Sequence, residues 1–111
     1  MTIHGIGTAP VSFGVYGAVD QLTVTPLDLL DAAVDAGYRG MELGPPGFFG
    51  STRETAQAFA ERDLATVGAY VPVHFSADDE TVARDLARME LNLAELVAAG
   101  SQTGLAILAD E

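Results

Sequence analysis

The sequence predicts an α/β fold whose strands are parallel and alternate with helices in the order β-α-β-α-β-α-β. Two observations carry this prediction. Short apolar segments alternate with longer amphipathic ones, and successive strands begin roughly 28 to 37 residues apart, about the length of one strand-helix-strand unit. The 111 residues are 49% hydrophobic and 19% charged, a composition typical of one globular domain and not of a disordered segment.

The first strand candidate covers residues 3–9, which glycines interrupt, and it ends at Pro10. Thr25 is the predicted N-cap of the first helix, because Pro26 follows at the first helical position, where its missing N–H is tolerated. This helix is expected to end near Gly37, since glycine readily adopts the left-handed conformation that closes helices. Helical spacing predicts a buried face made of Leu29, Leu30, Ala33 and Val34.

The second strand candidate covers residues 38–43, and the Gly-Pro-Pro-Gly run at 44–47 excludes regular structure directly after it. Ser51 and Glu54 match the capping box of a second helix. Asp63 is predicted to end that helix, because aspartate tolerates the left-handed region better than most residues. One face of the helix carries Ala56, Phe59 and Ala60.

The third strand candidate covers residues 66–73 and is rich in β-branched and aromatic side chains. The longest helix follows Asp78, has an acidic first turn that suits the helix dipole, and is expected to end at Gly100. Residues 103–109 form the fourth strand candidate. A 4-3-4-3 spacing predicts a buried stripe along the long helix, formed by Val82, Leu86, Met89, Leu93, and Leu96 with Val97.

Two folds satisfy this order of elements: an open doubly wound sheet and part of an eight-stranded (β/α)8 barrel. Local pattern slightly favours the open sheet, because 111 residues cannot close an eight-stranded barrel. A dinucleotide site is unsupported, because no Gly-x-Gly-x-x-Gly motif follows a strand; Gly5 and Gly7 lie inside the first strand with no helix directly after them.

Composition excludes several classes of partner and site. The formal net charge of -11 argues against binding to nucleic acid or to anionic membranes, because both attract clustered positive charge. The sequence has no cysteine, so disulfides and thiolate chemistry are excluded. No signal-peptide pattern opens the chain and no apolar run reaches the length of a membrane span, so we expect a cytoplasmic protein.

Two segments are more specific than the order of elements. Residues 7–15 read Gly-Thr-Ala-Pro-Val-Ser-Phe-Gly-Val, and residues 41–50 read Met-Glu-Leu-Gly-Pro-Pro-Gly-Phe-Phe-Gly. They resemble the first-strand motif Ala-Pro-x-Ser-Trp-Gly and the second-strand motif Glu-Leu-Gly-Pro-x-Gly of inosose dehydratases and related sugar phosphate isomerases/epimerases of the xylose isomerase-like superfamily. Phe13 stands where tryptophan is usual. Residues 64–75 are similar to the third strand of the same group.

The resemblance implies that residues 1–111 are a single partial domain, strands one to four in the N-terminal half of a (β/α)8 TIM barrel of roughly 250 residues. It implies a sugar or polyol substrate and, for the full-length family, a divalent metal (Mn, Co, Mg or Zn). The family's metal ligands and paired catalytic glutamates lie in the second half. No catalytic residue and no metal ligand is therefore assigned here, and no cofactor is expected for this chain alone.

Active sites of such barrels lie at the carboxyl ends of the strands, and the predicted substrate-pocket residues there include Glu42 and His74. Glu42 either accepts hydrogen bonds from substrate hydroxyls or is a solvated residue at the barrel mouth. His74 either binds a sugar oxygen and carries a proton near neutral pH, or is satisfied by backbone carbonyls at the strand end. The side chains of Glu42, His74 and Asp110 are ligands that suit a hard divalent ion. However, they come from three separate strands, so no spacing in the sequence indicates that they meet.

Ser12 is a further pocket residue; no Gly-x-Ser-x-Gly motif surrounds it, as expected if it lines the pocket and is not a nucleophile. Phe13, Phe48 and Phe49 are candidates for an apolar wall against a sugar ring, with packing over the barrel mouth as the open alternative. His4, at the start of the first strand, is expected on the opposite, structural face.

Three functions follow from these observations. The first, which the family resemblance implies, is that the chain is a fragment of a metal-dependent sugar or polyol isomerase, epimerase or dehydratase that abstracts a proton next to a carbonyl, and is inactive alone. Alternatively, it is a non-catalytic truncated half barrel that forms a homodimer through its open sheet edges or needs a partner. A third possibility is a flavodoxin-like small-ligand binding module, in which strand one lies inside the sheet.

Overall fold

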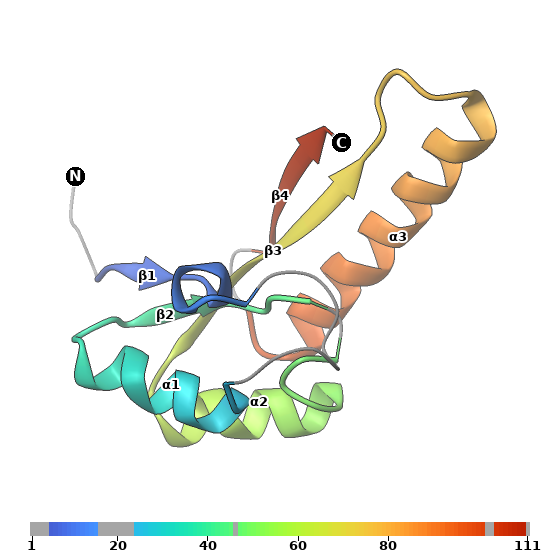
Figure 1. The fold of residues 1–111 in the computed structure, drawn as a ribbon. Helices are drawn as coiled ribbons and strands as arrows, with labels where there is room; N and C mark the ends of the chain where they lie inside the picture. The colour runs from blue at the N-terminus through green and yellow to red at the C-terminus, as the bar shows by residue number, and fades with distance from the viewer. Residues whose placement is uncertain (1–4, 16–23, 46, 102–103, 111) are drawn as a thin grey trace.

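The computed structural model of the chain describes residues 5–15, 24–45, 47–101 and 104–110. Strands and helices alternate along the described residues in the predicted order (Figure 1), with a 3-10 helix, η1, added after the first strand. The elements are β1 (Gly7–Thr8), η1 (Pro10–Phe13), α1 (Pro26–Asp35), β2 (Gly40–Glu42), α2 (Thr52–Glu61), β3 (Ala65–Val73), α3 (Asp79–Ala98) and β4 (Leu105–Asp110).

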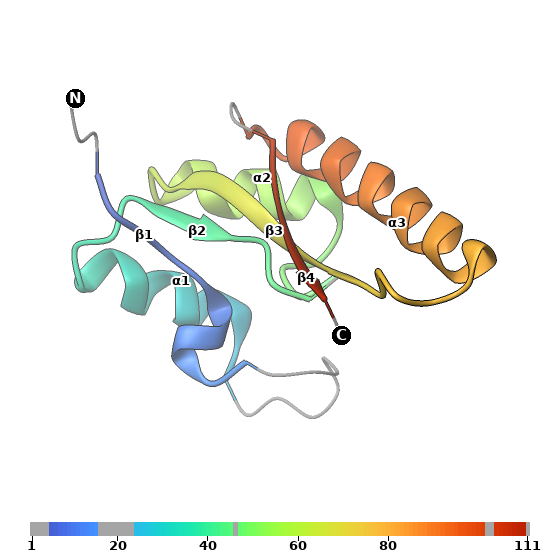
Figure 2. The same ribbon diagram turned by 90° about the horizontal axis from the view of Figure 1, so that it is seen from above.

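The strands form one parallel four-stranded sheet in the order β1-β2-β3-β4, which confirms the predicted α/β fold. Each new strand is added on the same side of the previous one, and Figure 2 shows this progression from β1 to β4. Right-handed crossovers in such an order place the helices on one face, as in a barrel wall. Because β1 lies at an edge and the order never reverses, the flavodoxin-like alternative is wrong.

The main core lies between β2 and the helices α1 and α2, which run together below β1 and β2 in Figure 1. Phe49 links two other aromatic rings in edge-to-face contacts, with centroids 4.7 Å from Phe48 and 5.1 Å from Phe59. The most deeply buried members of the core, at 0–1% exposure, are Leu29, Leu30, Ala33, Met41 and Phe59. The predicted helix face is thus confirmed except for Val34, which is 39% exposed.

Two glycines let β1, β2 and β3 approach closely. Gly7 and Gly40 are register partners on β1 and β2, and the side chain of Val67 lies over both. A Cβ at Gly40 would come within 2.6 Å of Val67 Cγ1, closer than atoms of packed side chains approach one another. Any larger residue at position 40 would therefore displace Val67 or separate β2 from β3.

The predicted caps of the first two helices are confirmed. Thr25 Oγ1 accepts from the backbone N–H of Asp28 at 3.3 Å, with Pro26 in the first turn of α1. Ser51 and Glu54 form the reciprocal capping box at the start of α2, with distances of 3.1 and 3.2 Å. Asp63 follows α2 with a φ of 52°, the left-handed conformation expected of it.

Helix α3 begins and ends where the sequence indicated. The side chain of Asp78 accepts from the backbone N–H of Thr81 at 2.8 Å, and Gly100 follows the helix with a φ of 98°.

The strand boundaries differ from the predicted ones. The second strand is only Gly40–Glu42, with a register shift between Met41 and Glu42, and the Gly-Pro-Pro-Gly run follows soon after it. Of the first strand candidate, Gly7–Thr8 is paired, while residues 3 and 4 lie outside the described residues, as does residue 103 of the fourth. The third strand, Ala65–Val73, agrees with prediction to within one residue.

The predicted buried stripe on α3 is wrong for two of its members, since Leu86 is 44% and Val97 is 64% exposed while Leu96 is fully buried. Among the described elements α3 packs mainly on β3 and less on the edge strand β4, so the side chains that point past that edge stay in water. Periodicity predicts a face of a helix but not whether a neighbour covers it. On α2, Ala60 is likewise exposed, and the buried residues are Thr55, Ala58 and Phe59.

Leu30→Ala should lower the free energy of unfolding by about 2–5 kcal/mol, because it opens a cavity in the core between α1, α2 and β2. The matched control is Leu27→Ala on the same helix, where the side chain is 53% exposed and the expected loss is below about 0.5 kcal/mol. Urea unfolding of both variants measures the difference. Equal losses for the two would contradict the core described above.

Candidate functional site

The carboxyl ends of the four strands do not lie at one level. Glu42, the last residue of β2, is the register partner of Gly68, whereas β3 continues to Val73, the partner of Asp110 on β4. His74 therefore lies about 20 Å further along β3 than Gly68, at roughly 3.3 Å per residue. The structure brings His74 near Asp110 and leaves Glu42 well apart from both.

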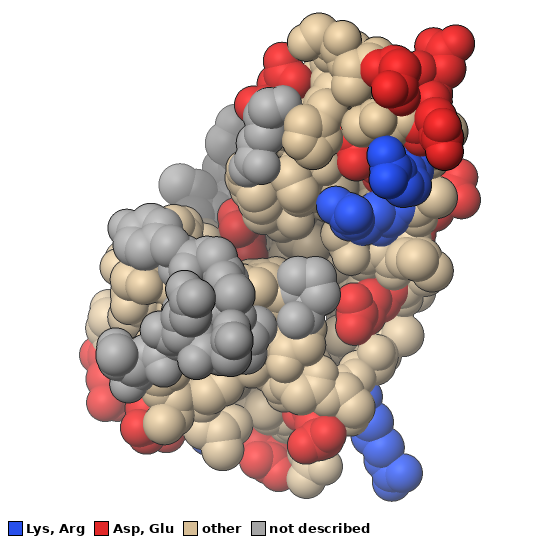
Figure 3. Space-filling view, turned by 45° about the vertical axis from the view of Figure 1, so that its right-hand side comes forward, with Lys and Arg blue, Asp and Glu red and all other residues tan. Residues whose placement is uncertain are grey.

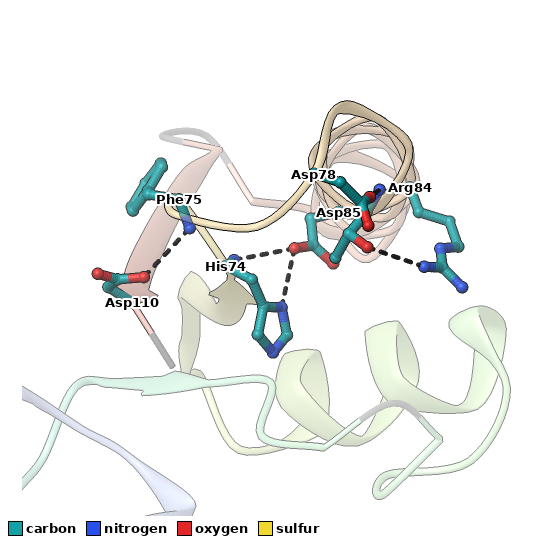
Figure 4. Close-up of polar contacts among 7 residues, drawn as sticks. His74, Phe75, Asp78, Arg84, Asp85 and Asp110 are labelled. Carbon is teal, nitrogen blue, oxygen red and sulfur yellow. Dashed lines mark hydrogen bonds and ion pairs between the residues drawn. The ribbon is translucent and has the colours of Figure 1, made fainter.

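His74 is held by a buried carboxylate that the sequence prediction did not include. Asp85 Oδ2 accepts from the backbone N–H of His74 at 2.9 Å and lies 3.0 Å from Nδ1 of its ring. The side chain of Asp85 is 6% exposed and that of His74 is 42% exposed. Figure 4 shows the ring with Nδ1 toward Asp85 and its second nitrogen, Nε2, pointing away from that carboxylate.

The two hydrogen bonds explain the ionisation of Asp85. Hydrogen bonds from His74 lower the pKa of Asp85 more than its burial raises it, so Asp85 stays ionised at neutral pH. An ionised carboxylate has only acceptors. The alternative in which backbone carbonyls satisfy His74 is therefore wrong for Nδ1, which faces a carboxylate supplied by α3.

Asp110 has a local role at the end of β4. Its Oδ1 accepts from the backbone N–H of Phe75 at 3.1 Å, which ties the turn after β3 to the last residue of β4 (Figure 4). The backbone N–H groups of the adjacent residues His74 and Phe75 thus donate to carboxylates from two different elements, α3 and β4. The ring of Phe75 itself is 58% exposed.

Glu42 is half-buried, and burial raises the pKa of its carboxyl above the ordinary value of 4.5. Its register with Gly68 puts it on the sheet face of Tyr70, opposite the face where Ala69 and Val71 are buried. This open face also carries Leu105, which is 56% exposed. A carboxyl on the inner face of a barrel wall would meet whatever the barrel encloses.

The remaining predicted pocket residues are spread over the surface and the core. Ser12 is exposed on η1, and its backbone N–H donates to the carbonyl of Ala9 at 2.9 Å. Phe13 is partly buried against the core, and Phe48 is a core member with 3% exposure. The rings of Phe48 and Phe49 thus pack inward, in the core.

A small cavity lies beside these rings, lined by the loop after β2 together with residues of β3, α2 and α3. Its volume of about 30 Å³ has room for roughly one water and not for a sugar ring. The residues that line it include Phe48, Ala69, Asn92 and Glu95.

The divalent metal implied by the family resemblance does not fit the described residues. Within the parts of the chain that the structure describes, no three histidine, aspartate or glutamate side chains gather to hold an ion. The separation of Glu42 from His74 and Asp110 explains why the three-strand combination considered from sequence does not form. His4, Pro46 and Glu111 lie outside the described residues.

Asp85 is the site residue that sequence reasoning missed. It lies three residues after Val82 and four before Met89, on the helix face that was predicted to be apolar. A charged residue on that face was the sequence feature that could have identified it. A carboxylate on the inward face of a helix needs a partner, and a histidine at the end of the preceding strand is within reach of the first helical turns.

Acidic side chains occur in several separate groups on the face drawn in Figure 3, and arginines lie between some of them. This dispersed distribution is typical of a solvated surface. No helix among the described residues is both long enough and apolar enough to cross a membrane.

Glu42→Gln should stabilise the 111-residue chain at neutral pH, because it removes an ionised carboxylate that burial disfavours. Because the pKa of Glu42 is raised in the folded chain, ionisation of this carboxyl lowers the stability of the fold as the pH rises above 4.5. Below that pH the carboxyl is protonated, so the stability gained by Glu42→Gln should vanish. We expect less than about 1 kcal/mol, since water screens a half-exposed charge. Urea unfolding at both pH values tests this, with the exposed Glu90→Gln as control; a gain that persists in acid would contradict it.

A scan against protein-family models and a search of curated proteins each gave no match. A search of solved structures found a chain described as a xylose isomerase-like TIM barrel/4-hydroxyphenylpyruvate dioxygenase fusion protein, with a TM-score of 0.70 and 20% sequence identity. The match covers 94% of this chain and 16% of the fusion protein. At this identity the likeness shows the fold: the chain has the parallel strand-helix arrangement of part of a TIM barrel.

Proposed function

We propose that the chain is part of a sugar or polyol isomerase, epimerase or dehydratase, of the kind represented by inosose dehydratases, and that it forms the strand-one-to-four wall of the substrate pocket. The observation that carries the proposal is His74, half-exposed at the carboxyl end of a TIM-barrel strand and held there by Asp85. Enzymes with this architecture place their chemistry at those strand ends.

The reaction class follows from what a fixed imidazole does well. Isomerisation, epimerisation and dehydration of sugars each move a proton at or next to a carbon that carries oxygen, and histidine is the side chain that exchanges protons near neutral pH. His74 would bind a substrate oxygen and assist that transfer. Glu42, Ser12 and Phe13 lie apart from His74 and would line a separate part of the barrel wall at β2 and η1, with no step through a metal ion.

The match to a solved structure supports the proposal that these residues form only part of a larger barrel. The chain spans 16% of the fusion protein it resembles, and four strands with open edges line only one side of a barrel. The proposed enzyme therefore needs more wall than these residues provide.

In the whole protein, His74→Gln should lower kcat/KM on ketose or inosose substrates by about 10²-fold or more, the usual contribution of an acid-base group. Turnover is measured with and without added Mn²⁺, Co²⁺, Mg²⁺ and Zn²⁺. Gln57→Ala, exposed on α2, is the control expected to leave kcat/KM unchanged. Unchanged activity of the His74 variant would overturn the role of His74, and no turnover by the unaltered whole protein would overturn the reaction class.

The 111-residue chain alone should show no turnover of these substrates with any of the four metal ions, because its strands leave the pocket open. The assay is the same, with the whole protein as the positive control. Metal-dependent activity of the isolated chain would contradict its assignment as a part of the enzyme.

A second candidate, a non-catalytic half barrel that self-associates, is favoured by the apolar side chains at the β4 edge. Leu105 and Leu108 are 56% and 46% exposed, and β4 has an unpaired side in the described sheet. Such an edge pairs readily with another chain. Burial of these two side chains in a second copy would remove apolar surface from water.

Sedimentation velocity of the 111-residue chain should show concentration-dependent dimers that Leu105→Glu weakens by about tenfold or more, since each buried leucine contributes about 1.5–3 kcal/mol. Leu27→Glu, at an equally exposed leucine on α1, is the matched control and should leave the dimer intact. A monomer at every concentration would exclude this candidate.

A further inference from the structure

We propose that Asp85 is a positioning residue that holds the neutral imidazole of His74 as its Nδ1–H tautomer, so that Nε2 is an acceptor for a hydroxyl group of the substrate. The identity of the substrate rests on the function proposed above. The tautomer does not, because it follows from contacts within this chain.

The proton on Nδ1 follows from its partner. Asp85 Oδ2 lies 3.0 Å from Nδ1, and a carboxylate oxygen can only accept a hydrogen bond at that distance. A neutral ring with its proton on Nε2 would place two lone pairs against each other. The ring therefore carries its proton on Nδ1, and a hydrogen bond to a charged acceptor biases the tautomers by about tenfold or more.

The carboxylate is itself fixed in place. The same oxygen, Oδ2, accepts from the backbone N–H of His74 at 2.9 Å, so the ring and the main chain of one residue are bound at a single point. Asp85 is buried on α3, whose start is capped by Asp78 through Thr81 at 2.8 Å. Neither partner can turn without breaking one of these bonds.

The second ring nitrogen, Nε2, determines which kind of group His74 can bind. Nε2 of the Nδ1–H tautomer has a lone pair and no proton, so it accepts from a donor such as a hydroxyl and does not bind a carbonyl oxygen. In Figure 4 this nitrogen points away from Asp85, and the side chain is 42% exposed. Under the proposed function, a hydroxyl of the sugar or polyol substrate would be the donor that approaches His74.

The test is ¹⁵N NMR of the ring nitrogens of His74 in the 111-residue chain, at a pH where the imidazole is neutral. The sequence has two histidines, and a His4→Gln background leaves one set of ring signals. We expect Nδ1 to show the shift of a protonated nitrogen and Nε2 that of an unprotonated one. In Asp85→Asn the ratio of the two tautomers should fall by about tenfold, because the charged acceptor is lost.

Asp110→Asn is the matched control, because Asp110 binds the neighbouring N–H of Phe75 and should leave the tautomer of His74 unchanged. A dominant Nε2–H tautomer in the unaltered chain would overturn the inference even if the Asp85 variant failed to fold. An equal change in both variants would overturn it too. Neither outcome bears on turnover, so failure of the proposed function is measured separately, by the activity of the whole protein.

Discussion

Strand β3 is the element on which the other parts of this structure depend. It pairs with β2 on one side and β4 on the other, and α3 packs mainly on its face. Its residues alternate strictly from Ala69 to Val73, with Ala69, Val71 and Val73 buried and Tyr70 and Pro72 turned to the open face. Since a slip of one residue would exchange the two faces, burial of this single row sets the register of the sheet.

The length of β3 also decides the candidate site. Strand β3 continues past the end of β2 and stops level with β4. The residues directly after β3 therefore contact the first turns of α3 and the end of β4, and not Glu42. Two carboxylates, Asp85 and Asp110, then reach the consecutive backbone N–H groups of His74 and Phe75. Burial of an ionised group is unfavourable unless it is hydrogen-bonded, and Asp85 meets that condition through His74.

The apolar side chains exposed on the open face of the sheet and on the outer part of α3 are exposed for the same physical reason. A singly wound parallel sheet is covered by helices on one side, and its inner face and edges need further strands. Exposure of Tyr70 and Leu105 on the inner face and of Leu86 and Leu108 near the edge follows from this arrangement. The same surface is what a barrel wall would present to the rest of a barrel, or what a second copy would cover.

The sequence by itself determined the local features: the order of elements, the caps at Thr25 and Ser51, the start of the long helix after Asp78, and the left-handed turn at Asp63. Each depends on hydrogen bonds or backbone angles within three or four residues, so the signal lies inside a short window. His74 at the end of a strand was also visible from sequence, because a strand end is a local property.

Only the tertiary structure decided which of these residues meet. The pairing of His74 with Asp85, the separation of Glu42 from His74 and the inward packing of Phe48 depend on strand register and on the position of α3 over β3. The exposure of Leu86 depends on what lies beyond an edge strand. Periodicity along one chain carries no information on register between strands or on the cover of a helix face, since both are set by contacts between distant segments.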